Sequence, residues 1–311
     1  IRDSTSVVDI FNMSFGSMGG SNFDTSGIPG SFENAFINGT QVLRGGLGAI
    51  YVKSSGNGWY DSPNGWCYSG GVALTSTAFN EKFSCTIASF DVNNTEPYLI
   101  STASLNAKDE RSSYSTPGTS VWISGYGGEF GVTDPAVLST DLHGCDKGFA
   151  SSTITNDTNC NYYHAMNGTS AAAPTISGAI ALILEANPNL TWRDVKHILA
   201  STATQIDSSF AKNYLGVDIY KWTTNAAGFK HHPSNVFGKV DIASAINAAL
   251  AYNLGSLGSM ASTSGSQNSL NLSIDSYART TMSAAKVSIT APSGKSKIDF
   301  VKLSVGFTHP D

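Results

Sequence analysis

The first sixty residues place two apolar runs on either side of an amphipathic segment. Val7 to Gly16 (VVDIFNMSFG) is mostly apolar and closes on Ser-Phe-Gly, which predicts a buried strand that leads into a turn. Ser31 to Leu43 has apolar residues at helical spacing behind a Ser cap, and Gly48 to Gly58 is a second apolar run that ends in a Gly-rich loop. Strand, helix and strand in this order predict an α/β fold with a parallel sheet.

The second half of the chain predicts three more helices. One is expected to begin near Ser170 and to end at the Asn187-Pro188-Asn189 turn. The next is capped by Thr191 with Asp194 three residues later, which is the spacing of a capping box. Val236 to Ala251 is expected to form a tight strand followed by a last helix.

The remaining segments differ in amino-acid composition from these helices. Trp59 to about Asn161 is rich in Gly and Ser and predicts short strands, whereas Leu254 to Ser269 is Gly/Ser-rich and nearly uncharged, as linkers are. Leu270 to Asp311 alternates like β-structure but is too short for a complete sheet, so we expect it to be part of a larger one. The abrupt start at Ile1 likewise suggests that a segment has been removed upstream.

Charge and apolar length exclude two classes of partner. The 311 residues include 18 Lys and Arg against 23 Asp and Glu, a net charge of -5, and no basic stripe is visible, so we expect no nucleic-acid partner. No apolar stretch approaches the length of a membrane span, so we expect no membrane partner.

Four cysteines fall into two couples that are local in the sequence. Neither couple has Cys-x-x-Cys spacing, and no His follows at the spacing of zinc ligands. Two loop-closing disulfides, Cys67 with Cys85 and Cys145 with Cys160, are favoured because both segments are polar and Gly-rich; four buried free thiols are the alternative. Disulfides and the low Lys content favour a secreted, extracellular protein of bacterial type.

Ser170 is the candidate nucleophile. A serine hydroxyl attacks a carbonyl only when a base takes its proton, and the resulting oxyanion needs hydrogen-bond donors. A helix start supplies such donors, because its dipole and free backbone N–H groups face developing negative charge. Gly168 and the small residues Ala171 to Ala173 leave room for a substrate across the first turn. The alternative is that Thr169 or Ser170 merely caps the helix, and the Gly-Thr-Ser triplet alone favours that alternative.

The wider sequence resembles a known enzyme family. The string GTSAAAP…SGAIALILEANPNLTWRDVKHIL resembles the nucleophile segment of the subtilisin-like serine proteases, in the wording of the kexin and furin branch. FGKVDIASAI resembles the end of that family's catalytic domain, and GLGAIYVKSSGNG resembles its oxyanion segment. The stretch between Asn57 and Ser170 is longer than in kexin or furin, and this long insertion fits the bacterial kexin-like extracellular proteases of the aeromonad type.

The resemblance also implies a domain organisation. Residues 1–253 would be the C-terminal part of a subtilase catalytic domain, with the α/β parallel sheet and helices of subtilisin. Residues 254–269 would be a linker, and residues 270–311 the first strands of an all-β jelly-roll, a β-sandwich like the P-domain of kexin-like proteases. The chain would stop within that domain.

The resemblance further assigns roles to individual residues. Asn57 corresponds to the asparagine whose amide donates to the oxyanion, the alternative being a turn residue in Ser-Gly-Asn-Gly. Enzymes of this branch cut after basic residues and need acids in their pockets, although either candidate acid could instead be a solvated loop residue. The implied substrate-binding residues are Ser14, Phe15 and Gly16 on a strand that pairs with the substrate, Ser54, Ser55 and Gly56 on the opposite pocket wall, Asp91 as the pocket acid, and Asp24 as the acid of a neighbouring subsite.

Two family features lack residues in this sequence. No triad Asp or His can be assigned, because neither His143 nor His164 lies in a Gly-His-Gly-Thr type segment. The loops SMGG and SYSTPG lack the acids that kexin and furin have there, so the structural calcium of the family is expected without assignable ligands. No organic cofactor is expected.

These observations lead to one hypothesis and two alternatives. The hypothesis is a serine endopeptidase that cuts peptides or proteins after basic residues, with the triad Asp and His on an upstream fragment of the same protease. Both chain ends fall where such an enzyme would cut, which suggests a self-nicked fragment. Expected partners are that upstream fragment, the rest of the β-sandwich domain, and a propeptide or dedicated chaperone. The alternatives are a catalytically inert binding scaffold and a subtilase-type acyl transferase that ligates peptides.

Overall fold

The computed structural model describes residues 7–16, 30–59, 68–69, 72–73, 84–153, 156–210, 212–214, 217–261 and 301. The predicted linker is therefore covered as far as residue 261, and the predicted β-sandwich segment lies outside the described residues except for residue 301. The candidate subsite acid Asp24 and the predicted disulfide partner Cys67 lie outside them as well.

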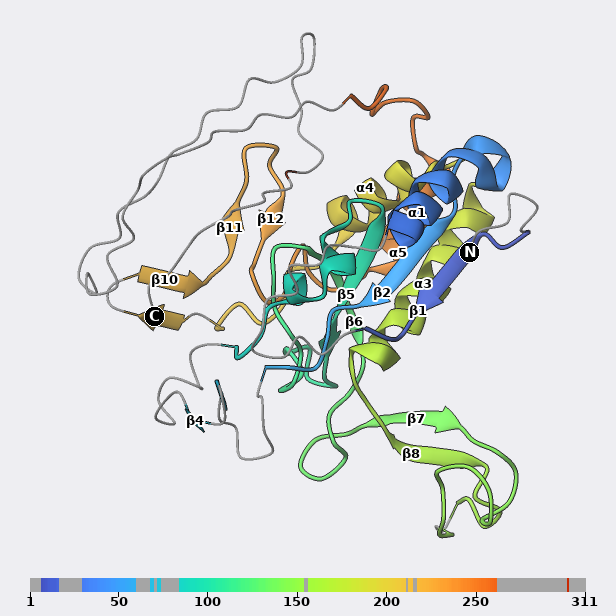
Figure 1. Ribbon diagram of the computed structural model, residues 1–311, viewed down its shortest axis with the longest axis vertical. Helices are drawn as coiled ribbons and strands as arrows, with labels where there is room; N and C mark the ends of the chain where they lie inside the picture. Colours follow the sequence, from blue (N-terminus) through green and yellow to red (C-terminus); the bar gives the residue numbers. More distant parts are fainter. Residues whose placement is uncertain are drawn as a thin grey trace.

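A four-stranded sheet forms the centre of the molecule (Figure 1). Its order is β1 (Ile10–Met13), β2 (Ile50–Ser54), β5 (Leu99–Leu105) and β6 (Val121–Tyr126), and each neighbouring pair is parallel. Every residue of β2 and β5 is buried, as expected when helices cover both faces of a parallel sheet. The predicted α/β fold with a parallel sheet is confirmed.

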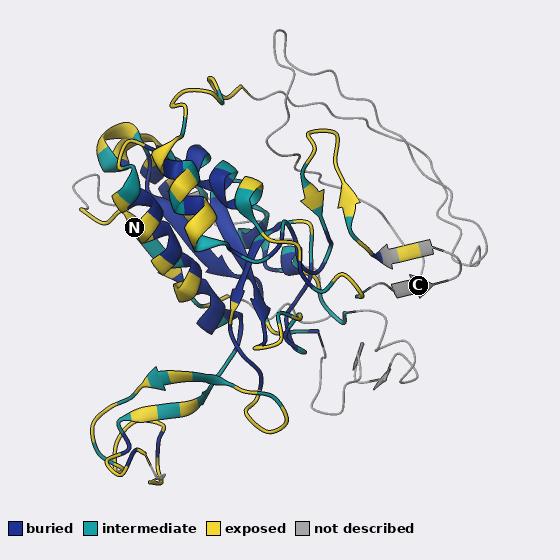
Figure 2. Ribbon diagram, turned by 180° about the vertical axis from the view of Figure 1, so that it is seen from behind, coloured by how far each residue is buried: buried dark blue, intermediate teal, exposed yellow. Residues whose placement is uncertain are grey.

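The two faces of the sheet are covered by different helices. Ile50, Val52 and Ile100 pack in one buried cluster with α3 (Thr169–Ala186) and α5 (Ile242–Leu250). The intervening side chains point to the other face, where Tyr51 and Leu99 pack against Phe36 of α1 (Gly30–Val42). This alternation follows from the two-residue period of a strand. Buried residues are accordingly concentrated in the sheet and on the helix faces that touch it (Figure 2).

Helix boundaries agree closely with the local sequence signals. In α4 (Trp192–Thr202), the Thr191 hydroxyl accepts from the Asp194 backbone N–H while the Asp194 carboxylate accepts from the Thr191 N–H, which confirms the predicted capping box. By length and composition alone α3 could cross a membrane, but half of its apolar window is buried inside the structure, as in the core helix of a folded domain.

The strand predicted at the start of Val236–Ala251 is wrong, whereas the helix that follows it forms as α5. Val236 has a φ of 53°, a left-handed conformation that a strand cannot accommodate. Around it the backbone forms only isolated bridges, in which Lys239 pairs with Ser124 on one side and Thr204 on the other.

The middle of the chain holds two of the four central strands, β5 and β6, together with short elements. The 3₁₀-helices are η1 (Leu43–Gly46), η2 (Ala88–Phe90) and η3 (Val92–Thr95). The short strands form antiparallel pairs: β3 (Tyr68–Ser69) with β4 (Val72–Ala73), β9 (Lys212–Tyr214) with β10 (Val217–Tyr220), and β11 (Thr223–Thr224) with β12 (Lys230–His231).

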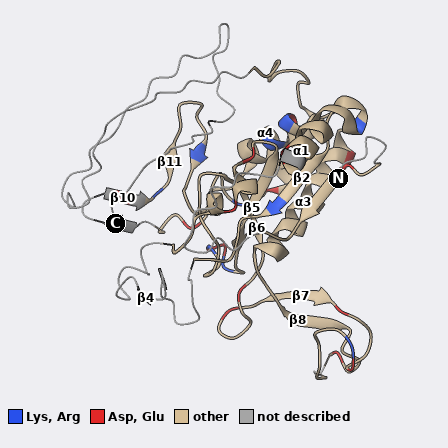
Figure 3. Cartoon of the chain, viewed as in Figure 1, with Lys and Arg blue, Asp and Glu red and all other residues tan. Residues whose placement is uncertain are grey.

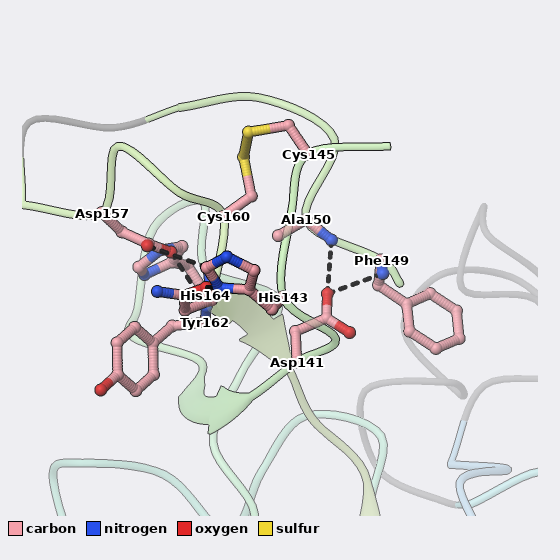
Figure 4. Close-up of a disulfide and its surroundings, with 10 residues drawn as sticks. Asp141, His143, Cys145, Phe149, Ala150, Asp157, Cys160, Tyr162 and His164 are labelled. Atoms are coloured by element: carbon pink, nitrogen blue, oxygen red, sulfur yellow. Dashed lines mark hydrogen bonds and ion pairs between the residues drawn. A yellow bond between two sulfur atoms is a disulfide. The ribbon is translucent and has the colours of Figure 1, made fainter. Parts of the chain in front are cut away.

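An antiparallel arm projects from the body of the molecule (Figure 1). It consists of β7 (Val137–Thr140) and β8 (Tyr162–Met166), and the predicted disulfide between Cys145 and Cys160 closes its tip (Figure 4). The Asp141 carboxylate holds the tip by accepting from backbone N–H groups, chiefly that of Ala150, which lower its pKa. Cys85 is also disulfide-bonded, although its predicted partner lies outside the described residues.

Buried His232 gives the fold a predicted pH dependence. Its Nδ1 accepts from the Ser234 and Asn235 backbone N–H groups, and its Nε2 bonds to the Phe210 carbonyl, so the ring is held as the neutral Nε2–H tautomer. Burial lowers its pKa to about 4 from 6.5. As the pH falls, the unfolded chain is therefore protonated at a higher pH than the folded protein. The free energy of unfolding, which is at its full value above pH 6.5, should fall by up to about 3 kcal/mol between pH 6.5 and 4.

Urea unfolding between pH 7.5 and 4 measures this dependence. His232→Gln removes the titrating group, so its free energy of unfolding should fall less steeply across that window. An equally steep profile in the variant would show that other groups cause the loss.

Candidate active site

Ser170 lies in the first turn of α3. The N-cap is Gly168, which has a φ of 107° that favours glycine and no side chain of its own to cap the helix. Its carbonyl accepts the first helical hydrogen bonds, from the N–H groups of Ala171 and Ala172. The alternative that Thr169 or Ser170 serves as the N-cap is therefore wrong, and both hydroxyls are left for other contacts.

The Ser170 hydroxyl meets the end of strand β1. Its Oγ donates to the Ser14 carbonyl at 3.3 Å, and the Ser14 Oγ donates to the Ser170 carbonyl at 2.8 Å. The two residues are 156 positions apart in the sequence. The sheet thus brings the predicted substrate strand to the predicted nucleophile.

Asn57 follows strand β2 and faces the same turn. Its Oδ1 accepts from the Thr169 backbone N–H at 2.8 Å and from the Thr169 hydroxyl at 2.9 Å. Because a backbone N–H can only donate, the amide atom that faces it is the oxygen. The donor Nδ2 is then directed to the Gly168 side, where a Cβ on that glycine would lie 3.1 Å from it. This arrangement presents an N–H donor beside the candidate nucleophile.

Tyr114 bonds to Gly168 at the start of α3 and was not predicted as a site residue from the sequence. Its buried hydroxyl accepts from the Gly168 N–H at 2.7 Å and donates toward the carbonyls of Gly127 and Gly128. Burial raises the pKa of Tyr114, so the hydroxyl stays a neutral donor and acceptor at neutral pH. Nothing in the local sequence Ser-Tyr-Ser-Thr identifies this role, because the partners are distant in the chain.

The two predicted walls of the pocket, residues 14–16 and 54–56, begin where two neighbouring strands end. Strands β1 and β2 are parallel neighbours with Met13 opposite Lys53, so residues 14–16 and 54–56 emerge from adjacent strands at the same edge. Ser54 and Ser55 are buried, whereas Phe15 is exposed. The Ser55 hydroxyl donates to the Thr116 carbonyl, which fixes the wall beneath Asn57.

Asp91 lies between η2 and η3, as the N-cap of η3, and its carboxylate lies beside Gly16. It is buried, and its Oδ2 forms an ion pair with Lys53 Nζ at 2.7 Å. A Cβ atom on Gly16 would overlap both the Asp91 carboxylate and the Lys53 ammonium group. The structure therefore places the predicted pocket acid directly behind the predicted substrate strand, but with a cation already bound to it.

The five described histidines are engaged away from Ser170. Their partners are Asn161 for His143, Asp157 for His164, Tyr252 for His197, Phe237 for His231 and Phe210 for His232. Figure 4 shows His143 and His164 near the tip of the β7–β8 arm.

Nor do the described residues gather the donors of a metal site. Nowhere in the part of the chain that the structure covers do three or more His, Cys, Asp or Glu side chains gather as they would around a metal ion. Figure 3 also shows the Lys and Arg residues dispersed over the described elements instead of gathered on one face.

Comparison with known proteins supports the sequence resemblance. The model of the subtilase family of peptidases matches residues 1–240. Over 266 residues the chain is 33% identical to the Aeromonas extracellular serine protease of Aeromonas sobria, covering 77% of this chain and 41% of that protein. It is 30% identical over 221 residues to mouse proprotein convertase subtilisin/kexin type 7, covering 69% of this chain and 22% of that protein.

Solved structures agree with these relatives. The crystal structure of the serine protease of Aeromonas sobria matches with a TM-score of 0.67 and 30% identity, covering 79% of this chain and 44% of that one. The same protease in complex with a chaperone matches with a TM-score of 0.66 and 30% identity, covering 79% and 43%. The chain spans less than half the length of these relatives.

Proposed function

The chain belongs to the subtilase family, and from this premise we propose that it contributes the nucleophile and the oxyanion donors of a serine endopeptidase. The observation that supports this most is the convergence of Ser170 and Asn57 on one turn through Thr169, from segments 112 positions apart. An asparagine amide with its oxygen occupied and its nitrogen beside a helix-start serine is suited to stabilising an oxyanion.

In the proposed reaction the Ser170 Oγ attacks the scissile carbonyl carbon of a peptide. The carbonyl oxygen becomes an oxyanion that accepts from Asn57 Nδ2 and from the backbone N–H of Ser170 at the helix start. The C–N bond then breaks, the amine leaves with the proton taken from Ser170, and an acyl-enzyme remains. Water attacks that ester, releases the acid and restores the serine hydroxyl.

The activating histidine and its orienting aspartate come from an upstream segment of the same protease. Two observations support this: the described histidines are engaged elsewhere, and the chain spans only 41% of the Aeromonas sobria protease. The Ser170 hydroxyl now donates to the Ser14 carbonyl, a bond that the incoming histidine would replace.

Substrates are extended peptides or proteins cut after basic residues. Ser14, Phe15 and Gly16 directly follow strand β1, and Ser14 bonds to Ser170, so a substrate backbone could pair with this segment beside the nucleophile. Asp91 behind Gly16 is the acid that would attract a basic side chain, and Asp24 remains the candidate for a neighbouring subsite. The protein is secreted, as its extracellular Aeromonas relative suggests, and a chaperone or propeptide assists it, since the Aeromonas sobria protease was solved with a chaperone.

Labelling by a fluorophosphonate tests the proposal. The probe should modify Ser170 when the protease is prepared with its upstream segment, and peptide mapping locates the label. Absence of labelling under those conditions would contradict the proposal and favour an inert binding groove. Labelling with net peptide ligation instead of hydrolysis would favour an acyl transferase.

Thr169→Val tests how Asn57 is held. The variant keeps the backbone bond to Asn57 Oδ1 but removes the hydroxyl that donates to the same oxygen and accepts from the Gly56 N–H. We expect kcat to fall about tenfold with little change in KM, because a charge-stabilising donor that loses one positioning bond weakens mainly the transition state. Steady-state peptide hydrolysis measures the split, and Thr175→Val, an exposed position on the same helix, is the control.

A further inference from the structure

We propose that Lys53 is a specificity-determining residue, because its buried ammonium group offsets the charge of Asp91 at the base of the pocket. The pocket would then favour positively charged substrate side chains much less than one with an uncompensated Asp91. This inference rests on the proposed function, in which Asp91 recognises the residue before the cleaved bond.

Lys53 and Asp91 form a buried and direct ion pair. Lys53 is 2% exposed and Asp91 is 6% exposed, with 2.7 Å between Nζ and Oδ2. Lys53 lies on strand β2, whose five residues are all buried, so its side chain cannot turn to solvent without leaving the sheet. The ammonium group is thus a fixed neighbour of the carboxylate.

Asn93 holds Asp91 in place from its other side. Its Oδ1 accepts from the backbone N–H and from the side-chain Nδ2 of Asn93, both at 3.1 Å. These bonds begin η3 and orient the carboxylate, leaving Oδ2 toward Lys53 and Gly16. A substrate cation that approached Asp91 would therefore meet Lys53 at the same oxygen.

The pair lies directly beside Gly16 of the proposed substrate segment. Both charged groups occupy the space that a side chain on Gly16 would need, and Gly16 lies two residues after Ser14, which bonds to Ser170. Lys53 itself comes directly before Ser54, Ser55 and Gly56, the opposite wall. The ion pair therefore sits between the two walls of the proposed pocket.

The formal charges of Lys53 and Asp91 determine which substrate side chains this pocket would favour. Within the pair the formal charges cancel, so a neutral side chain meets no net charge from it. A lysine or arginine of the substrate would instead bring a second cation within a few ångströms of Lys53, and like charges at that range repel even at a high effective dielectric. A buried ion pair also stabilises a fold weakly compared with apolar residues, so stability gives little reason for a lysine at this position.

The test is a cycle of three variants: Lys53→Met, Asp91→Asn, and both together. The readout is the ratio of kcat/KM for peptides with Arg and with Gln before the cleaved bond, in the protease prepared with its upstream segment. Lys53→Met should raise the ratio about tenfold or more, because removing the repelling cation exposes Asp91 to the substrate. Asp91→Asn should lower it, and the double variant should lie above Asp91→Asn.

The cycle stays decisive if one variant is unstable. Lys53→Met leaves a buried carboxylate without its cation and could fail to fold, but the double variant and Asp91→Asn differ only in the Lys53 charge. An unchanged ratio between those two, or an unchanged ratio in a folded Lys53→Met protein, would overturn the proposal and leave the pair a structural contact only.

Binding measurements separate this inference from the proposed function. Calorimetry with benzamidine and with neutral benzamide compares a cation with its neutral counterpart without turnover. The preference for benzamidine should rise in Lys53→Met by a similar factor. Loss of peptide hydrolysis with this preference intact would count against the proposed function alone, whereas no gain in preference would count against the role of Lys53.

Discussion

Replacing Ser170 with alanine should lower kcat for peptide hydrolysis about 10⁶-fold, the loss measured when the nucleophile is removed from subtilisin, a member of the same family. The variant keeps the helix start and Asn57 in place but has no oxygen to form the acyl-enzyme. The hydrogen bond from Ser14 to the Ser170 carbonyl involves the backbone and should persist, so folding should change little.

Ser177→Ala is the matched control for this variant. Ser177 lies two turns further along α3, and its hydroxyl bonds to the Asn12 side chain and to the Ala173 carbonyl. Its loss should leave kcat within about twofold, because no proposed catalytic group touches it. Substantial hydrolysis by Ser170→Ala, beside normal activity of Ser177→Ala, would mean that another residue is the nucleophile.

Removing the amide of Asn57 should lower kcat about 10²–10³-fold with KM nearly unchanged, the range measured for loss of the side-chain oxyanion donor in subtilisin, a member of the same family. The donor acts on charge that develops only in the transition state, so Asn57→Ala should spare substrate binding. Steady-state kinetics on one peptide over a range of concentrations separates the two constants.

Asn57→Asp distinguishes donation from positioning. The carboxylate can still accept from the Thr169 N–H and hydroxyl, as Oδ1 does now, but it has no proton to donate at neutral pH. Its kcat should fall at least as far as that of Asn57→Ala. A raised KM with normal kcat in both variants would instead identify Asn57 as a substrate-binding residue.

The elements that sequence reasoning predicted well are those with strong local signals. The Thr191 and Asp194 capping box, the apolar face of α3 and the apolar runs of β1 and β2 each depend on residues close together in the chain. Strand β5 shows the limit of this reasoning. The sequence predicted short strands between Trp59 and about Asn161 without locating β5, whose Ser101, Thr102 and Ser104 are completely buried because the sheet around them satisfies their backbone groups.

The same limit applies to the candidate site. Ser170 and Asn57 were predicted as site residues because each lies in a string that resembles a family segment, and Asp91 was predicted from a looser match. The hydroxyl of Tyr114 beneath Gly168 and the ammonium group of Lys53 beside Asp91 were not identified. Both contacts join segments that are 38 or more positions apart in the sequence, and no local spacing pattern predicts a contact over that separation.

The sequence alone determined the α/β class, the helix starts and the residues that match the nucleophile and oxyanion segments, and it favoured the disulfide at the arm tip, because caps, periodicity, cysteine spacing and motifs depend on short stretches of sequence. Only the tertiary structure decided that Ser170 is not a helix cap, that Asn57 turns its donor toward the same turn, and that Asp91, the predicted pocket acid, is paired with Lys53. Those outcomes depend on how parallel strands and their covering helices bring distant side chains to one edge of the sheet, where burial makes each charge and each hydrogen bond count.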